Sequence, residues 1–282
     1  MKIDFHTHPV LVREMWEKYP ELEHAARDIF FIRNRPQPLE TFILELKISG
    51  LDRAVLLPID ATTTRGCTIY SNQQIAELCQ KDPRFIGFCS VDPHNPDAPV
   101  VLEQAVKELK LRGLKLSPPT QEFFPNDRRL VYPLYEKAEK LGIPVVFHAG
   151  MSWEPRARLK YAHPLLLEDV AADFPDLRIV IAHFGWPWVL DTIALALKYH
   201  NIYIDTACLY FGNPKHFLSF VMKEQIPLSV IEKSLREKIV FGSNYPRVEI
   251  KNMVYAISQL GLSSECLELI FSYNPQKVLG EV

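Results

Sequence analysis

Residues 2–8 of the chain read KIDFHTH, a short apolar run that ends in two histidines. Successive side chains of a β-strand point to opposite faces, so His6 and His8, together with Asp4, are expected on one face. The same design, an apolar run that ends in histidine, recurs at residues 145–148 (VVFH) and 179–183 (IVIAH). These endings indicate a site at the carboxyl edge of a set of buried strands.

Eight short apolar runs recur along the chain, separated by longer stretches with helical spacing of apolar residues. Strict strand–helix alternation implies parallel strands joined by right-handed crossovers. Eight repeats in 282 residues predict a single (β/α)₈ barrel domain over 1–282. An open doubly wound sheet is the alternative, although no glycine-rich phosphate loop follows the first run. The predicted strands are Lys2–His6, Arg53–Leu57, Phe85–Val91, Gly113–Leu116, Ile143–His148, Arg178–His183, Asn201–Asp205 and Lys238–Gly242.

The composition favours a globular protein that binds a small molecule. The formal net charge is -2 and 48% of the residues are hydrophobic, so neither nucleic acid nor a membrane is an expected partner. The N-terminus lacks the apolar run of a signal peptide. An odd, unclustered set of 5 cysteines is typical of reduced thiols, and we expect a cytoplasmic location. The sequence leaves a homodimer open.

Two segments lie outside the strand–helix repeat. Residues 9–38 form a long first connection, and a loop of this length in a barrel is often a lid over the site. Its candidate covering residues are aromatic or cationic, and the chain after Pro246 is expected to form helices that cap the barrel. The residues singled out in the first segment are Trp16, Tyr19, Phe30, Phe31, Arg33 and Arg35.

Four of the 9 histidines fall at predicted strand ends, where their side chains can converge. We expect His6, His8 and His148 to hold one divalent metal ion, and zinc suits three imidazoles with one open position. The alternative is that they are buried histidines satisfied by the backbone. The other five histidines show no mutual pattern; they are His24, His94, His163, His200 and His216.

Five motifs together resemble the strand-end motifs of the amidohydrolase superfamily, and they span nearly the whole chain. The resemblance is strongest to the amidohydrolase-related group, which contains hydrolases of carboxylate substrates and non-oxidative decarboxylases of the aminocarboxymuconate-semialdehyde and hydroxybenzoate type. It implies that His6, His8 and His148 bind metal and that His183 binds a second metal or acts as acid or base. The motifs are IDFHTH (3–8), GLKLSP (113–118), VVFHAG (145–150), IAHFGWPWV (181–189) and FGSNYP (241–246).

Asn244 departs from the family pattern, which has an aspartate at this place in the last motif. An amide offers only a neutral carbonyl oxygen as ligand and cannot take up a proton. Three interpretations stay open. His183 takes over the proton transfer, the site is metal-poor or degenerate, or the residue is an engineered inactivating change.

Several residues are candidates for binding substrate. In some members of the superfamily the lysine at the place of Lys115 is carbamylated and bridges two metals, whereas an unmodified lysine favours a substrate carboxylate. Arginines after two of the strands could bind a carboxylate with two hydrogen bonds, and aromatic residues could stack on a planar substrate. Asp205 is a candidate to orient His183 or one of the metal ligands, and pairing in the core or at a cap is the alternative. These arginines and aromatics are Arg33, Arg35, Arg156, Arg158, Trp16, Trp153, Trp186 and Tyr210.

The leading hypothesis is a metal-dependent hydrolase that cleaves a C–O or C–N bond of a small carboxylate-bearing substrate, with His183 and Asn244 at the reacting centre. The first alternative is a non-oxidative decarboxylase of an unsaturated or aromatic acid. A second is a degenerate barrel that binds a ligand without catalysis, and Asn244 is the residue that keeps this alternative open.

Overall fold

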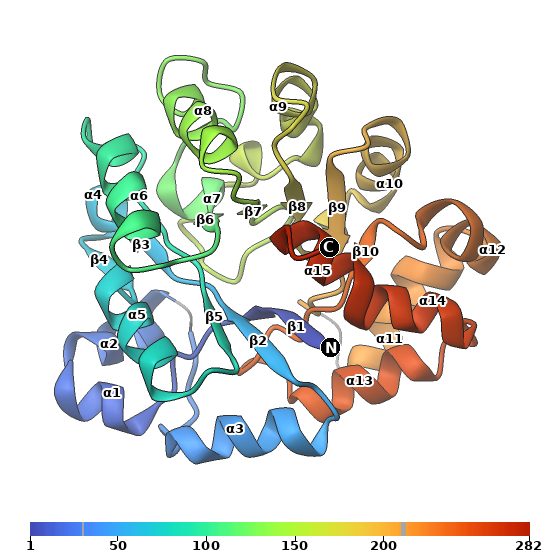
Figure 1. The fold of residues 1–282 in the computed structure, drawn as a ribbon, viewed down its shortest axis with the longest axis horizontal. Helices are drawn as coiled ribbons and strands as arrows, with labels where there is room; N and C mark the ends of the chain where they lie inside the picture. The colour runs from blue at the N-terminus through green and yellow to red at the C-terminus, as the bar shows by residue number, and fades with distance from the viewer. Residues whose placement is uncertain (30, 210–212) are drawn as a thin grey trace.

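The computed structural model describes residues 1–29, 31–209 and 213–282 of the chain. Each of the eight apolar runs contains or overlaps a strand, and the paired strands are parallel (Figure 1). The alternation predicted from the sequence is therefore confirmed. The strands are β1 (Ile3–Thr7), β2 (Arg53–Leu56), β5 (Phe85–Gly87), β6 (Leu114–Leu116), β7 (Val145–Phe147), β8 (Ile179–Ile181), β9 (Ile202–Asp205) and β10 (Ile239–Val240).

The strands form two sheets, β1-β2-β5 and β10-β9-β8-β7-β6, that meet at two seams. At one seam the Cys89 amide donates to the Gly113 carbonyl (2.8 Å) and the Lys115 amide donates to the Cys89 carbonyl (2.7 Å). At the other the Phe5 amide donates to the Phe241 carbonyl (2.7 Å). The backbone bonds of both seams complete the predicted barrel, and the open doubly wound sheet is rejected.

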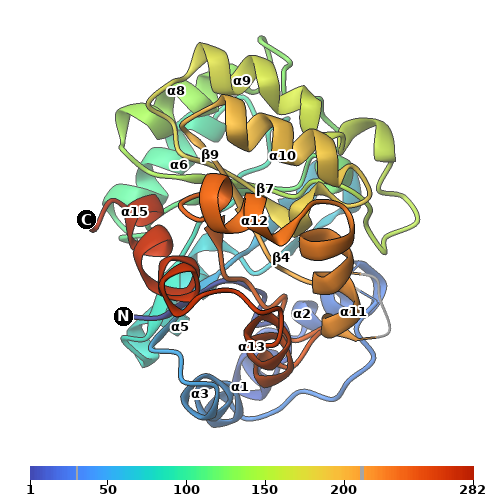
Figure 2. The same ribbon diagram turned by 90° about the vertical axis from the view of Figure 1, so that its right-hand side faces the viewer.

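Helices surround the strands, and the short last helix covers one end of the barrel together with the two termini (Figures 1 and 2). The chain after Pro246 is largely helical, as expected. The α-helices are α1 (Arg13–Lys18), α2 (Glu21–His24), α3 (Leu39–Ile48), α4 (Thr62–Arg65), α5 (Asn72–Lys81), α6 (Ala98–Lys107), α7 (Pro118–Gln121), α8 (Tyr132–Lys140), α9 (Glu168–Asp173), α10 (Val189–Lys198), α11 (Pro214–Ser219), α12 (Leu228–Val230), α13 (Ile250–Ser258), α14 (Ser264–Glu268) and α15 (Asn274–Leu279). Short 3₁₀ or π turns are η1 (Ala25–Ile29), η2 (Leu159–Tyr161), η3 (Pro164–Leu167), η4 (Ala182–Gly185), η5 (Phe220–Glu224), η6 (Ile231–Leu235) and η7 (Leu269–Tyr273).

Alternate residues of the strands fill the inside of the barrel with apolar side chains. Val278 and Leu279 of α15 belong to the same buried cluster, so the last helix closes the amino-terminal end of the barrel. This leaves the carboxyl end as the open end. The residues of this cluster that lie in the strands or directly after them include Ile3, Phe5, Val55, Phe88, Val146, Val180, Tyr203 and Val240.

An irregularity in β1 changes which side chains face the interior. The register with β2 shifts between Asp4 and Thr7, so one extra residue of β1 is accommodated there. Asp4 is aligned with Ala54, which does not belong to the apolar cluster inside the barrel, and its Oδ1 accepts the backbone amides of His6 (3.1 Å) and Ser243 (2.9 Å). The expectation that Asp4 shares a face with His6 and His8 is wrong, because strict alternation does not hold across such a shift.

Two parts of the fold were not predicted. The antiparallel strands β3 (Ile59–Ala61) and β4 (Cys67–Ile69) form a hairpin after β2, with α4 at its tip. Residues 9–38 contain α1, α2 and η1 rather than one open loop, while Phe30 lies outside the described residues. None of the helices in the described part of the chain has both the length and the apolar character that a membrane span requires.

Candidate active site

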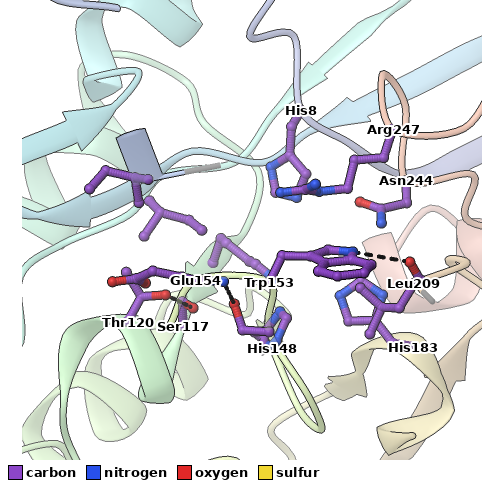
Figure 3. Close-up of a pocket in the computed structure, with 14 residues that line it drawn as sticks. His8, Ser117, Thr120, His148, Trp153, Glu154, His183, Leu209, Asn244 and Arg247 are labelled. Carbon is purple, nitrogen blue, oxygen red and sulfur yellow. Dashed lines mark hydrogen bonds between the residues drawn. The ribbon is translucent and has the colours of Figure 1, made fainter. Parts of the chain in front are cut away.

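A pocket opens at the carboxyl ends of the barrel strands (Figure 3). One end, the histidine end, is formed by His8, His148, His183, Asn244 and Arg247, with His6 behind His8. The other, the glutamate end, is formed by Glu154 with the hydroxyl groups of Ser117 and Thr120. The remaining residues that line the pocket are Ile29, Ile59, Lys115, Ser152, Trp153 and Leu209.

His6 and His8 face each other with their Nε2 atoms 3.1 Å apart. His8 Nδ1 donates to the Leu57 carbonyl (2.8 Å), because a carbonyl can only accept. His6 Nδ1 donates to the carboxylate of Asp205 (2.7 Å), and both residues are fully buried. Since each Nδ1 carries the proton of its neutral ring, both Nε2 atoms present lone pairs to the same point.

Asp205 at the end of β9 joins two of the histidines. Its Oδ2 accepts from His6, while its Oδ1 accepts the backbone amides of His183 (2.7 Å) and Ala207 (3.0 Å). The ring of His183 donates from Nδ1 to the Ala207 carbonyl (3.1 Å), which leaves Nε2 as an acceptor. Ligand atoms of His6, His183 and Asp205 all lie within 4.8 Å of one another. Asp205 therefore orients His6 directly and positions the turn that carries His183.

His148 follows β7 and its ring lies next to that of His183. Its ring centroid lies 4.8 Å from that of His183, and the centroid of His183 lies 4.7 Å from that of His6. The Nε2 of His148 donates to the Met151 carbonyl at 3.3 Å, so Nδ1 is the nitrogen with a lone pair. The structure thus brings His8, His148 and His183 to one pocket, with His6 against His8, but does not group His148 tightly with His6.

Burial keeps the histidines neutral. Desolvation is the main cause that lowers the pKa of His6, His8 and His183 well below the usual value, and it lowers the pKa of His148 to about 3. The positive charge of Lys115 lowers each of them further. Neutral imidazoles are the form that binds metal ions, so the site is ready for a cation near neutral pH.

Lys115 lies at the end of β6 and is 1% exposed. Its Nζ is buried and has no hydrogen-bond partner among the described residues. Desolvation lowers the pKa of this ammonium group to about 7, opposed by the charge of Asp205. A buried ammonium without a partner is costly, and an anion in the pocket would stabilise it.

Asn244 follows β10 with a φ of 68°, a left-handed conformation that asparagine tolerates better than most residues. Its Nδ2 donates to the Cys208 carbonyl (2.7 Å) and its backbone amide donates to the His6 carbonyl (2.9 Å). The amide group is therefore fixed with its oxygen as the remaining polar atom. Gly242 allows this approach, because a Cβ there would lie 2.7 Å from the His6 Cβ.

The other predicted substrate-binding residues are spread more widely. Arg33 borders an outer hollow that shares Trp153 and Arg247 with the pocket, and Trp153 is 48% exposed. Arg35 and Trp186 are not among the residues that line either space. Arg156 and Arg158 are exposed, and Tyr210 lies outside the described residues.

Sequence reasoning missed several polar residues of the pocket or its wall, among them Arg247, Glu154, Thr120 and Arg65. Arg247 comes three residues after Asn244 and acts on His8 and His148 electrostatically. Arg65 of α4 is buried and its Nε donates to Glu154. None of these four ends a barrel strand, so the strand pattern gave no signal for them.

Comparison with known proteins supports the family resemblance that the strand-end motifs indicate. The sequence profile of the family described as Amidohydrolase matches residues 3–280. A curated relative, 2-keto-4-carboxy-3-hexenedioate hydratase of Sphingobium sp. (strain NBRC 103272 / SYK-6), is 30% identical over 176 residues, 49% of this chain and 50% of that protein. The match thus spans about half the length of the relative.

Solved structures show the same fold. An uncharacterised TIM-barrel protein from Bordetella bronchiseptica has a TM-score of 0.79 at 23% identity, over 99% of this chain and 98% of that chain. 5-Carboxyvanillate decarboxylase from Novosphingobium aromaticivorans, solved with bound manganese and 3-methoxy-4-hydroxy-5-nitrobenzoic acid, has a TM-score of 0.65 at 17% identity, over 99% and 97% of the two chains. With the family profile matching almost every residue, the chain belongs to the amidohydrolase family of enzymes.

Proposed function

We propose that the protein is a metal-dependent hydrolase that cleaves a C–O or C–N bond of a small carboxylate-bearing substrate. The observation that carries the proposal is the pair of Nε2 lone pairs of His6 and His8, 3.1 Å apart. Two lone pairs at this distance repel each other unless a cation lies between them. Two imidazole nitrogens on one tetrahedral zinc ion would stand about 3.3 Å apart, so the pair fits such an ion.

The donor set is that of a divalent first-row metal, and zinc is our choice among them. His148 would complete the ligands through Nδ1, since its Nε2 is committed to Met151. Such an ion would polarise a substrate oxygen and lower the pKa of a water molecule. Manganese is the competing choice, because a protein of the same fold carries it.

His183 is the proton carrier in this proposal. Its Nδ1 is held by the Ala207 carbonyl, so Nε2 can accept a proton from the attacking water and return it to the leaving group. Asn244 cannot do this, because its amide has no basic atom at neutral pH. Its side-chain oxygen would instead accept a hydrogen bond from the water or contact the cation.

Lys115 and Arg247 provide the anion-binding groups. Both lie close enough to His8 and His148 to lower their pKa values, so both act at the histidine end. A substrate carboxylate beside Lys115 would pair the buried ammonium, and the guanidinium of Arg247 suits a second contact with that anion. This is why we propose a carboxylate-bearing substrate.

Residues 9–38 would act as a lid over this pocket. Ile29 of this segment lines the pocket itself, and Phe31 and Arg33 line the outer hollow. Arg27 stacks on Trp16 at 5.2 Å from the ring centroid, which ties the segment together. Cross-linking the segment to the loop after β7 should block substrate entry if the segment opens during turnover.

Hydration of a carbon–carbon double bond is the second candidate, favoured by the name of the curated relative. Hydration and hydrolysis both begin with attack of an activated water on an electrophilic carbon, and His183 would carry the proton in either. Decarboxylation, the activity in the name of the Novosphingobium aromaticivorans protein of the same fold, is a third outcome of the same test.

The test combines metal analysis with a substrate panel. Purified protein should contain close to one equivalent of a divalent metal, and a chelator should abolish turnover of at least one lactone, amide, unsaturated 2-oxo acid or aromatic acid. The His8→Gln variant should lose the metal, while His200→Gln, with an exposed side chain, should keep it. A metal-free protein with no turnover of any class would contradict the proposal and favour a ligand-binding barrel.

A further inference from the structure

The glutamate end of the pocket has a charge opposite to that of Lys115. We propose that the substrate carries, besides its carboxylate, a hydrogen-bond donor in the form of a hydroxyl or amino group, and that Glu154 binds this donor. The carboxylate part of this inference rests on the function proposed above, whereas the donor part rests on Glu154 and its neighbours alone.

Glu154 is 5% exposed and lines the pocket at its glutamate end. One carboxylate oxygen, Oε1, accepts from Arg65 Nε, whereas Oε2 is buried and has no hydrogen-bond partner among the described residues. An ionised carboxylate can only accept hydrogen bonds. Leaving one of its oxygens unsatisfied in a buried place is costly, so a donor from the substrate would relieve that cost.

Arg65 binds one carboxylate oxygen of Glu154 and leaves the other without a hydrogen bond. The Nη1 atom of Arg65 donates to Glu122 Oε1 (2.8 Å) and to the Thr64 carbonyl (3.0 Å). Its guanidinium thus contacts Glu154 through Nε alone among the described contacts, while Nη2 is buried and has no hydrogen-bond partner among the described residues. Because Arg65 sits at the tip of the β3–β4 hairpin, this hairpin fixes the position of the Glu154 carboxylate.

Hydroxyl groups share the same wall of the pocket. Ser117 Oγ donates to Thr120 Oγ1 at 3.1 Å, and Ser152 Oγ accepts the backbone amide of Glu154 at 3.3 Å. Figure 3 shows Glu154, Thr120 and Ser117 gathered on one side of the pocket, with Asn244 and Arg247 on the other. A substrate that reaches across therefore meets acceptors and hydroxyls at one end and cationic groups at the other.

This polarity discriminates between classes of small acids. A second carboxylate at the glutamate end would face Glu154 and be repelled, since like charges brought together disfavour binding. A hydroxyl or an amine there would donate to the free oxygen. The fitting ligand is therefore a hydroxy acid or an amino acid rather than a dicarboxylate with its second anion at Glu154.

Calorimetric titration of the zinc-loaded full-length protein tests this with matched ligands. Benzoate and butyrate serve as parent acids, and their hydroxylated and aminated derivatives, substituted at each available position, serve as partners. At least one donor-bearing acid should bind about tenfold or more tightly than its parent, the gain expected of a hydrogen bond to a charged group. Comparing the hydroxylated with the aminated series decides which donor the site prefers.

Variants of Glu154 test whether this residue causes the preference for acids that carry a hydrogen-bond donor. In Glu154→Ala the ratio of the two affinities should fall to about one, because the acceptor is gone, and in the isosteric Glu154→Gln it should fall in part. Glu122→Gln is the matched control, because Glu122 pairs with the same Arg65 but is 37% exposed at its side chain and does not line the pocket. The wild-type ligand ratios need no variant, so they test the proposal even if Glu154→Ala does not fold.

Two results would overturn the inference. Equal binding of every parent acid and its donor-bearing partners by the wild type would show that Arg65 satisfies both oxygens of Glu154. A preference that survives in Glu154→Ala would place the acceptor elsewhere. If acids bind, and bind more weakly in Lys115→Met, the proposed function stands even when the donor preference is absent. If no acid binds and no zinc is retained, both proposals fail together.

Discussion

The histidine end and the glutamate end of the pocket are supported by different parts of the chain. His6, His148 and Asp205 lie in or directly after barrel strands, so the hydrogen-bonded barrel fixes their positions. Glu154 lies in the loop after β7, and Arg65, which holds it, comes from a hairpin inserted after β2. We infer that the strands supply the reacting groups and that the loops set which substrate reaches them.

The two ends also differ in how far their charged and polar groups find partners within the protein. At the histidine end neutral rings converge on one point beside an unpaired lysine, an arrangement that calls for a cation and an anion from outside. At the glutamate end the buried arginine pairs with two carboxylates, and Glu154 Oε2 and Arg65 Nη2 are the buried atoms left without a hydrogen-bond partner among the described residues. Changes at the first end should therefore abolish the chemistry, whereas changes at the second should alter selectivity.

The largest effect is expected from His8→Gln. Removing one of the two facing nitrogens should weaken metal affinity by more than the roughly 100-fold upper value typical of outer-shell partners, and turnover should be lost with it. Competition with a chromogenic chelator measures the affinity. His200→Gln should behave as the wild type, and a His8→Gln protein that retains tight metal binding would exclude His8 as a ligand.

His183→Asn separates proton transfer from metal binding. Turnover should fall by about 10²–10⁴-fold, the usual loss for a general acid or base, while metal content stays close to that of the wild type. Steady-state rates and metal analysis on the same preparation give both numbers. Loss of the metal in this variant would instead make His183 a ligand, in line with its place beside His6 and Asp205.

Asn244→Asp adds a negative charge at the position where the motif resemblance implies an aspartate. Metal affinity should rise by up to about 100-fold, the range over which groups around a metal ion tune it. A large gain of hydrolytic rate would show that Asn244 had disabled the site. Unchanged or lower rates, together with the loss in His183→Asn, would show a site built to work with the amide.

The smallest effect is a pH dependence of stability at the histidine end. His148 has a folded-state pKa of about 3 against a usual 6.5, so below pH 6.5 the unfolded chain binds more protons and stability falls as the pH drops. From pH 7 to pH 5 this residue should cost the metal-free protein about 2 kcal/mol. Urea unfolding should show that His148→Gln loses less stability than His200→Gln over this interval, and equal losses would refute a buried neutral His148.

The strand pattern was sufficient to predict the barrel and the convergence of the four histidines. A histidine that ends an apolar run, as His6, His148 and His183 do, is predicted to lie at the carboxyl edge of the barrel, because parallel strands of a barrel end at the same edge. The face of Asp4 was predicted wrongly, since a shift of one residue within β1 cannot be read from an unbroken alternation of residue types.

The glutamate end could not be predicted for a related reason. Arg65 and Glu154 are 89 positions apart in sequence, and each sits in a stretch without periodic apolar residues. Their pairing depends on how a hairpin folds back over a loop, which is a tertiary contact with no local signature. The place of Arg247 in the pocket could not be predicted either, because an arginine shortly after a strand is most often a solvated surface residue.

The central claim, that His6 and His8 share one divalent metal ion, is tested most directly by crystallography of zinc-loaded protein with anomalous diffraction at the zinc edge. We predict one strong peak about 2.0–2.1 Å from the Nε2 atoms of both histidines, the usual zinc–imidazole distance. A map with no peak between these two atoms at full zinc loading, or with the ion bound by other residues, would contradict the account.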